Sequence, residues 1–241
     1  MFVLLEYNEN YLENIKELKK LDYIPIILFK IVLNNKNQIK EDLQKLLDLK
    51  AKIKPKYTAL QITLEKIENS TIGTVNNMKN NFDIIIGLGG LNKANRFFLE
   101  STQIDFLQDP QNTLFFSKID FIHHFNSGIN HILCNFAKEK ETGFIFSLNF
   151  IYGNKTYIPK EIGRINQNLR FARKYNIDIY LNFIIKYPNQ IKSLKEIENM
   201  LSIFDLSNDQ KKNSLNILDL KIKNNEMKKT KKFICSEIIL K

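Results

Sequence analysis

Cysteine is scarce in this sequence. Its two cysteines, Cys134 and Cys235, are far apart, and neither belongs to a C-x-x-C unit. This spacing argues against a structural zinc site and indicates a reducing, intracellular compartment. We therefore expect a cytoplasmic protein.

Glycine and proline are also scarce, with 8 and 5 among the 241 residues. The sequence contains neither a Gly/Ser-rich linker nor an internal repeat, so nothing divides it into two folded domains. A chain of this length can bury one core, and α/β barrels of similar size fold as single domains. We expect one domain over residues 1–220, followed by a basic tail over 221–241 with a possible last strand at 233–239.

Long apolar runs are absent. The N-terminal segment MFVLLEYNEN has no basic stretch and reaches Glu6 after a few apolar residues, unlike a signal peptide. The run IPIILFKIVL is too short to cross a bilayer and is interrupted by Lys30. These features predict a soluble protein with no membrane partner.

Positive charge, by contrast, is abundant. The formal net charge is +10, and residues 221–241 carry seven lysines against Glu226 and Glu237, so this segment alone contributes +5. Such an excess favours a polyanionic partner, with nucleic acid ahead of membrane. The segment 221–232 is too polar to bury a core, and we expect it to be mobile without RNA.

Apolar segments rich in Ile, Leu, Phe and Val alternate with amphipathic segments along most of the chain. The predicted strands are 2–6, 25–32, 57–64, 82–88, 103–107, 143–149 and 177–185. The predicted helices are 10–21, 36–52, 70–79, 92–100, 128–141, 158–175, 193–204 and 207–219. Uniformly apolar strands are typical of a parallel sheet covered by helices. We expect an α/β fold, a TIM-like (β/α) barrel, with an open doubly wound sheet as the alternative.

Motifs for catalysis are missing. The turn GLGGLN at 87–92 has Asn92 where a dinucleotide-binding fingerprint needs its third glycine. All three histidines, His123, His124 and His131, lie in one stretch, whereas a barrel metallohydrolase needs ligands from the ends of several strands. Asp83 and Asp105 lie near the starts of their strands, away from the end where barrels do chemistry. We expect no catalytic residue and no metal or cofactor bound by the chain.

The predicted helix 158–175 presents more than one amphipathic face. Its apolar stripe comprises Ile158, Ile162, Ile165, Leu169 and Ala172, and the opposite side comprises Lys160, Arg164, Gln167, Arg170 and Lys174. Phe171 lies among these cations, and Arg173 flanks the stripe. A solvated helix face explains the charges, whereas an aromatic ring among cations indicates a surface covered by RNA or by protein.

Four segments in order resemble the ribonuclease P protein component 3 family, the archaeal counterpart of the eukaryotic thirty-kilodalton RNase P protein. Residues 82–110, FDIIIGLGGLNKANRFFLESTQIDFLQDP, are similar to its strand, Gly-Gly turn, Asn-Arg helix and following strand. Residues 126–150 resemble its Asp-Ser-Gly-Ile-Asn-His block, and residues 165–183 resemble its basic helix and next strand. The segment FICSEIIL matches the closing strand loosely. The clear match covers about 82–219, and residues 1–81 agree in element order alone.

The resemblance assigns structural roles to a set of motif positions. These are Gly89, Gly90, Asn95, Arg96, Asp105, Ser127, Gly128 and His131. The sequence also departs from the family: Asp109-Pro110 replaces His-Pro, Asn126 replaces an aspartate, and an insertion occupies about 112–125. The family resembles a metal-dependent phosphoesterase barrel that has lost its metal site, and the loss of one more histidine argues further against a metal here.

The resemblance implies a protein subunit of RNase P, in which the catalyst that removes the 5′ leader of precursor tRNA is an RNA that requires Mg²⁺. The implied partners are RNase P RNA, precursor tRNA, protein component 2 in a two-plus-two assembly, and other RNase P proteins. Phe171 would contact component 2. The RNA contacts would come from Lys160, Arg164, Arg170, Arg173, Lys174, Lys228, Lys229, Lys231 and Lys232. The alternatives are a metal-dependent phosphoesterase on the same barrel and a barrel of unrelated function.

Overall fold

A seven-stranded parallel sheet forms the centre of the computed structural model, which describes residues 1–33, 36–64, 78–112, 120, 124–229, 233–235 and 238–239. The strands are hydrogen-bonded in sequence order from β1 to β7. They are β1 (Phe2–Glu6), β2 (Ile24–Leu33), β3 (Thr58–Leu64), β4 (Ile84–Leu88), β5 (Phe106–Gln108), β6 (Gly143–Ser147) and β7 (Ile179–Asn182).

The sheet closes on itself at the carboxyl ends of its strands. Leu5 of β1 forms a parallel bridge with Ile185, just beyond β7. The backbone N–H of Glu6 donates to the carbonyl of Ile185 over 2.8 Å, and the N–H of Ile185 donates to the carbonyl of Leu4 over 2.9 Å. A sequential strand order with closure is that of a TIM-like barrel, so the predicted fold is confirmed. A doubly wound sheet would instead reverse its strand order.

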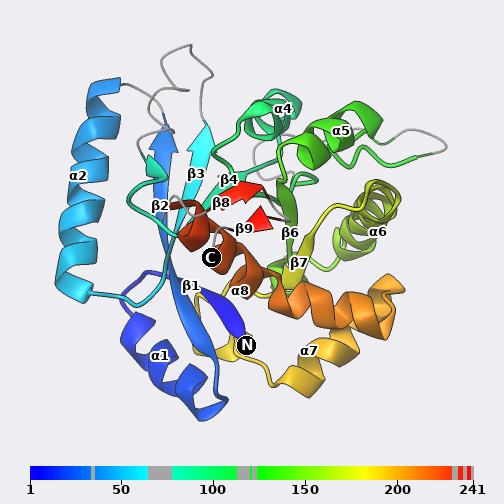
Figure 1. The fold of residues 1–241 in the computed structure, drawn as a ribbon. Coiled ribbons are helices and arrows are strands. Elements are labelled where there is room, and N and C mark those ends of the chain that lie inside the picture. The colour runs from blue at the N-terminus through cyan, green and yellow to red at the C-terminus, as the bar shows by residue number, and fades with distance from the viewer. Residues whose placement is uncertain are drawn as a thin grey trace.

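Helices surround the outside of this barrel (Figure 1). They are α1 (Tyr11–Lys20), α2 (Lys36–Ile53), α4 (Asn92–Glu100), α5 (His131–Glu139), α6 (Ile158–Tyr175) and α7 (Leu194–Leu201), with 3-10 turns at Leu148–Tyr152, Pro188–Gln190 and Ser202–Phe204. Their bounds agree with the predicted helices within a few residues. The helix predicted at 70–79 falls largely on residues 65–77, which lie outside the described residues.

The last long helix, α8 (Asn208–Lys229), does not join this outer layer along its whole length. Figure 1 shows it crossing the middle of the sheet, where it contacts β7 and β1. The Leu181 N–H of β7 donates to Ser214 Oγ of α8 over 2.9 Å. Leu215 packs in the outer core, whereas Leu218 and Ile222 pack inside the barrel against the inward side chains of the strands. The helix thus passes between the first and last strands.

The course of α8 corrects the predicted tail. We expected the domain to end at residue 220 and residues 221–232 to be mobile, but α8 continues to Lys229. Ile222 and Asn225 are buried, and the Asn225 amide donates to the carbonyl of Asp83 over 2.8 Å. The expectation was wrong because a helix that packs into two environments carries no single apolar stripe. Lys231 and Lys232 lie outside the described residues.

The predicted last strand at 233–239 is also different in the structure. Strands β8 (Phe233–Cys235) and β9 (Ile238–Ile239) form a separate antiparallel pair that does not join the barrel sheet. Within the described part of the chain, no helix combines the length and apolarity needed to cross a membrane.

Candidate functional site

The carboxyl end of a β/α barrel is where enzymes of this fold place their catalytic groups, and here it carries polar side chains from several strands. Glu6 of β1 pairs with Lys30 of β2 at 2.7 Å. The amide of Gln61 on β3 donates to Gln108 Oε1 on β5 over 2.5 Å, and both side chains are buried. These groups therefore satisfy one another across the interior of the barrel.

Asp109, which replaces the histidine of the family motif, joins several residues at this end through hydrogen bonds to its carboxylate. Its backbone φ is +47°, a conformation that aspartate tolerates better than most residues. One carboxylate oxygen accepts from the Ser147 N–H over 2.8 Å and from the Gln111 amide over 3.3 Å. The other accepts from Gln108 over 3.0 Å. Burial raises the pKa of Asp109 to about 6, against the opposing effect of these hydrogen bonds.

The described residues contain no group of three or more His, Cys, Asp and Glu side chains that could hold a metal ion. His124 and His131 are exposed, and His123 lies outside the described residues. Asp105 lies just before β5, at the amino end of the barrel, as predicted, where it accepts from the Ile85 N–H over 2.8 Å. Asp105 thus serves hydrogen bonding and an ion pair within the fold.

Asn95 explains much of the family motif. Its side-chain oxygen accepts from the Gly90 N–H over 3.0 Å, and its amide donates to the carbonyls of Pro110 and Gly128 over 3.1 and 2.9 Å. Gly90 and Gly128 have φ values of +129° and +79°, which favour glycine. A Cβ on Gly89 would lie 2.6 Å from the Asn95 oxygen. One buried amide therefore ties three loops together.

The other motif positions divide into buried and exposed groups. Ser127 is buried, with its carbonyl accepting from the Asn168 amide over 3.0 Å and its hydroxyl accepting from Gln167 over 2.9 Å. Arg96 is exposed and pairs with Glu100 at 2.7 Å. His131 is exposed at the start of α5. Arg96 and His131 therefore lie outside the core.

Helix α6 differs from its predicted charge pattern at one position. Arg164 is 5% exposed, and its guanidinium contacts both carboxylate oxygens of Asp120 at 3.0 Å. The prediction that Arg164 lies on the exposed face was wrong. Helical periodicity gives the face of a residue on its own helix, but it does not reveal that Asp120 of the insertion packs against that face. The remaining predicted cations of the helix, Lys160, Arg170, Arg173 and Lys174, are exposed.

Phe171 lies in a groove of about 430 Å³ between α4, α5 and α6. Phe125, Ile132, Phe136 and Phe171 form its apolar walls. Among the described lining residues, the ionisable side chains are those of Arg96 and His124. Ile132 is 50% exposed and Phe125 is 37% exposed. Sequence reasoning missed Phe125 because it belongs to the insertion. Gly163 makes room for it, since a Cβ there would lie 2.6 Å from the ring.

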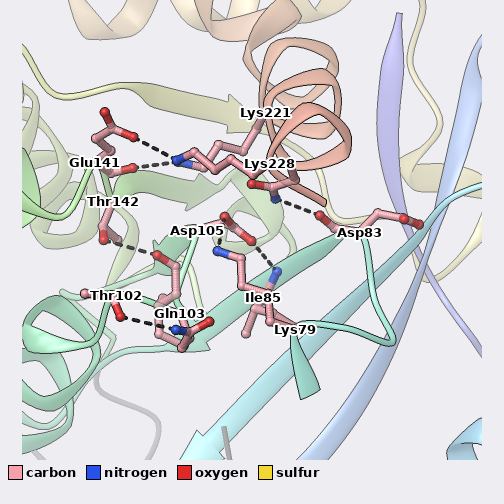
Figure 2. Close-up of polar contacts among 12 residues, drawn as sticks. Lys79, Asp83, Ile85, Thr102, Gln103, Asp105, Glu141, Thr142, Lys221 and Lys228 are labelled. Carbon is pink, nitrogen blue, oxygen red and sulfur yellow. Dashed lines mark hydrogen bonds and ion pairs between the residues drawn. The ribbon is translucent and has the colours of Figure 1, made fainter. Parts of the chain in front are cut away.

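The amino end of the barrel carries the second notable surface (Figure 2). Lys79 pairs with Asp105 at 3.2 Å, and Lys228 of α8 pairs with Glu141 at 3.0 Å. Lys221 donates to the Glu141 carbonyl over 2.6 Å. The predicted RNA contacts Lys228 and Lys229 therefore stand on a packed helix, and two further lysines that sequence reasoning missed stand beside them.

Electrostatics distinguish these lysines. Burial lowers the pKa of Lys221, although Asp105 and Asp178 oppose this effect. The hydrogen bond from Lys228 lowers the pKa of Glu141. Lys229 donates to the Phe82 carbonyl over 3.2 Å and lies 3.8 Å from Asp83. The surface thus combines a desolvated ammonium group with others that keep contact with solvent.

Fold and surfaces together define a TIM-like (β/α)-barrel protein with an apolar groove on one side and a lysine-rich amino end. In sequence, this barrel resembles ribonuclease P protein component 3, as the four motif blocks predicted, and in fold it resembles a chain of archaeal ribonuclease P.

Comparisons with known proteins support this resemblance. The chain is 24% identical over 132 residues to ribonuclease P protein component 3 of Methanosarcina barkeri, covering 52% of this chain and 51% of that protein. It therefore spans about half the length of this curated relative. No protein-family model matches the chain.

Solved structures share the fold. A chain in the cryo-EM structure of archaeal ribonuclease P with mature tRNA superposes with a TM-score of 0.71 at 18% identity, covering 94% of this chain and 91% of that chain. The Arabidopsis N6-mAMP deaminase superposes with a TM-score of 0.55 at 13% identity, covering 88% of this chain and 58% of that enzyme. At these identities, the likeness establishes the barrel fold.

Proposed function

We propose that this chain is a protein subunit of ribonuclease P and supports the catalytic RNA in removing the 5′ leader of precursor tRNA. The observation that carries the proposal is the agreement of fold with a chain of archaeal ribonuclease P along 94% of this chain. The sequence similarity to ribonuclease P protein component 3 points to the same subunit.

In this proposal the chain itself is not the catalyst. The described groups at the barrel mouth, among them Gln61, Gln108 and Asp109, are engaged with one another. General acid–base or metal-assisted hydrolysis instead needs groups that converge on one substrate position. The Mg²⁺ required for leader removal would be held by the RNA, and the barrel would supply binding surface.

RNA contacts are proposed at two surfaces. On α6, the exposed cations Lys160, Arg170, Arg173 and Lys174 would neutralise phosphates without reading sequence. At the amino end of the barrel, Lys228 and Lys229 would do the same. Arg164 is withdrawn from this set because it is buried against Asp120.

The groove between α4, α5 and α6 is the proposed contact with protein component 2, within a two-plus-two assembly. Ile132 and Phe125 expose apolar surface there, and Phe171 lies half-buried beside them against the core. Apolar and aromatic side chains of this kind form the centres of protein interfaces. Arg96 would face acidic or polar groups at the rim. Stacking of an unpaired base on Phe171 is the competing use of the same ring.

An affinity capture from native lysate tests the proposed function. The tagged full-length chain is recovered from its own cells, and the RNA that accompanies it is sequenced. We expect enrichment of RNase P RNA and of tRNA precursors relative to an unrelated protein of the same size and net charge. Equal recovery of these RNAs by both proteins would contradict the proposal, because bulk basic charge would then explain the association.

A further inference from the structure

A hollow of about 330 Å³ opens at the amino end of the barrel, between the end of α5 and the second half of α8. Its lining includes Lys138, Lys221 and Lys228, together with Asn176 and Asn224. Glu141 and Asp178 are its acidic lining residues, so the formal charge of the lining is three minus two, or +1. Three lysines and two asparagines from different elements thus line one small space.

Lys221 forms the inner wall of this hollow. Its ammonium group donates to the Glu141 carbonyl over 2.6 Å and lies 5.8 Å from the centre of the Phe106 ring. Burial lowers the pKa of Lys221 because it removes water from around the ammonium group. A bound anion would therefore stabilise the charged form. The ammonium group is also held in place by two protein contacts, which reduces the side-chain entropy lost on binding.

Glu141 occupies the position of a competing anion. Its carboxylate lies 3.0 Å from Lys228 Nζ, and the two side chains are 53% and 39% exposed. Ion pairs with this exposure contribute little to stability and exchange readily. The φ of Glu141 is +54°, at the turn between α5 and β6, so the carboxylate is attached to a defined turn. An incoming phosphate oxygen would therefore take over Lys228 at small cost.

A second hollow, of about 200 Å³, adjoins the first through Lys228, which lines both. Its lining also includes Lys79, Lys229, Gln103 and Asn225, with Asp83 as its acidic residue, so the formal charge of the lining is three minus one, or +2. Two adjoining hollows that share one lysine suit a polymer with repeated phosphates better than one free anion. Figure 2 shows Lys79, Lys221 and Lys228 around this end of the barrel.

We propose that these two hollows form a track for backbone phosphates of a nucleic acid strand, with Glu141 as an internal competitor that holds Lys228 when the track is empty. The identity of the strand as RNA rests on the proposed function, whereas the phosphate site rests on the hollows alone. Removing Lys228 and removing Glu141 should therefore have opposite effects on binding.

The test measures binding of a fluorescein-labelled oligouridylate to the full-length chain by anisotropy at several salt concentrations. Lys228→Gln should weaken binding several-fold and flatten the log–log salt slope by about one unit, as expected for one lost phosphate contact. Glu141→Gln should strengthen binding several-fold. The matched controls, Lys223→Gln on α8 and Glu139→Gln on α5, lie outside the lining of both hollows and should change binding less than the test variants.

Equal effects of Lys228→Gln and Lys223→Gln, or weaker binding by Glu141→Gln, would overturn the proposal. Competition by millimolar inorganic phosphate as effective as by the oligonucleotide would also overturn it, since the site would then take a free anion. Thermal melting checks that each variant folds. Oligouridylate binding that follows the predicted pattern without enrichment of RNase P RNA from lysate would reject the proposed function and keep the phosphate track.

Discussion

The two ends of this barrel use their polar residues in different ways. At the carboxyl end, Gln61, Gln108 and Asp109 are hydrogen-bonded to one another or to nearby backbone. At the amino end, Lys228 and Lys229 form ion pairs on side chains that are each 39% exposed. Buried partners hold a fold together, whereas exposed ion pairs are weak enough to be exchanged for a ligand. Gln61, Gln108 and Asp109 thus hold strands and loops together at the end where barrel enzymes place their catalytic groups.

The largest effect should come from the amide that fastens the loops beside the carboxyl end. Asn95→Ala removes three hydrogen bonds and leaves the Gly90 N–H and the carbonyls of Pro110 and Gly128 without this partner. We expect a loss of about 3 kcal/mol in the free energy of unfolding. Urea denaturation measures it, with Lys93→Ala on the exposed side of the same helix as control. A loss no larger than that of the control would show that these loops are held by other contacts.

A pH-dependent effect of similar size is expected for Asp109. Its pKa is about 6 in the folded protein, against an ordinary value of 3.8. Between these values the unfolded chain has released a proton that the folded protein retains. The stability associated with this proton is therefore complete below about pH 4 and is lost as the pH rises through 6. The loss should be on the order of 3 kcal/mol, from a pKa difference of about 2.2 at about 1.4 kcal/mol for each pKa unit.

Asp109→Asn removes this titration. The unfolding free energy of the variant relative to the wild type should rise between pH 4 and pH 7, as measured by urea denaturation at each pH. Comparison of the two proteins cancels the contribution of the other carboxylates, whose ionisation is common to both. A difference that stays constant with pH would contradict the desolvated environment assigned to Asp109.

Local patterns were sufficient for most of the barrel. Strand β1 and helices α4 and α6 have the bounds that the sequence pattern predicted, because α4 and α6 each bury one apolar face and β1 is a continuous apolar run buried on both faces. The second half of helix α8 was not predicted, because Leu215 packs in the outer core whereas Ile222 packs in the barrel interior. Its mixed pattern suggested a polar tail. Two packing environments on one helix cannot be recognised from one sequence alone.

Candidate site residues were harder to predict, because their environment depends on distant parts of the chain. Arg164 was assigned to the surface from its helical position, but Asp120 of the insertion covers it. Phe171 was recognised as an aromatic residue out of place, and the structure puts it in a groove beside Phe125. Lys79 and Lys221 gave no local signal, since they approach each other only where α8 crosses the barrel.

Phe171→Ala should show whether the groove binds a protein partner rather than RNA. Truncation of a buried aromatic residue at a protein interface weakens binding by about 2 kcal/mol, with little dependence on salt. We therefore expect weaker pairing with component 2 in a titration of purified proteins, and unchanged binding of RNA. Tyr157→Ala is the control, because Tyr157 is 65% exposed at the start of the same helix and outside the groove. Loss of RNA affinity with intact pairing would instead assign base stacking to Phe171.

The smallest effects should come from the exposed cations of α6. Arg170→Ala and Lys174→Ala should each flatten the log–log salt slope of RNase P RNA binding by about one unit and weaken binding modestly. Arg164→Ala should lower stability and leave the slope unchanged, because its guanidinium is engaged by Asp120. An unchanged slope for both exposed positions would make this helix face ordinary solvated surface.

Cleavage of precursor tRNA tests most directly whether this chain supports an RNA catalyst and does no chemistry itself. Leader removal is measured with RNase P RNA and its other proteins, with and without this chain, and with this chain alone in Mg²⁺, Mn²⁺ or Zn²⁺. We predict faster leader removal when the chain joins the RNA and proteins, and no cleavage by the chain alone. Metal-dependent cleavage by the chain alone, abolished by Asp109→Asn, would contradict this and would identify a phosphoesterase at the carboxyl end of the barrel.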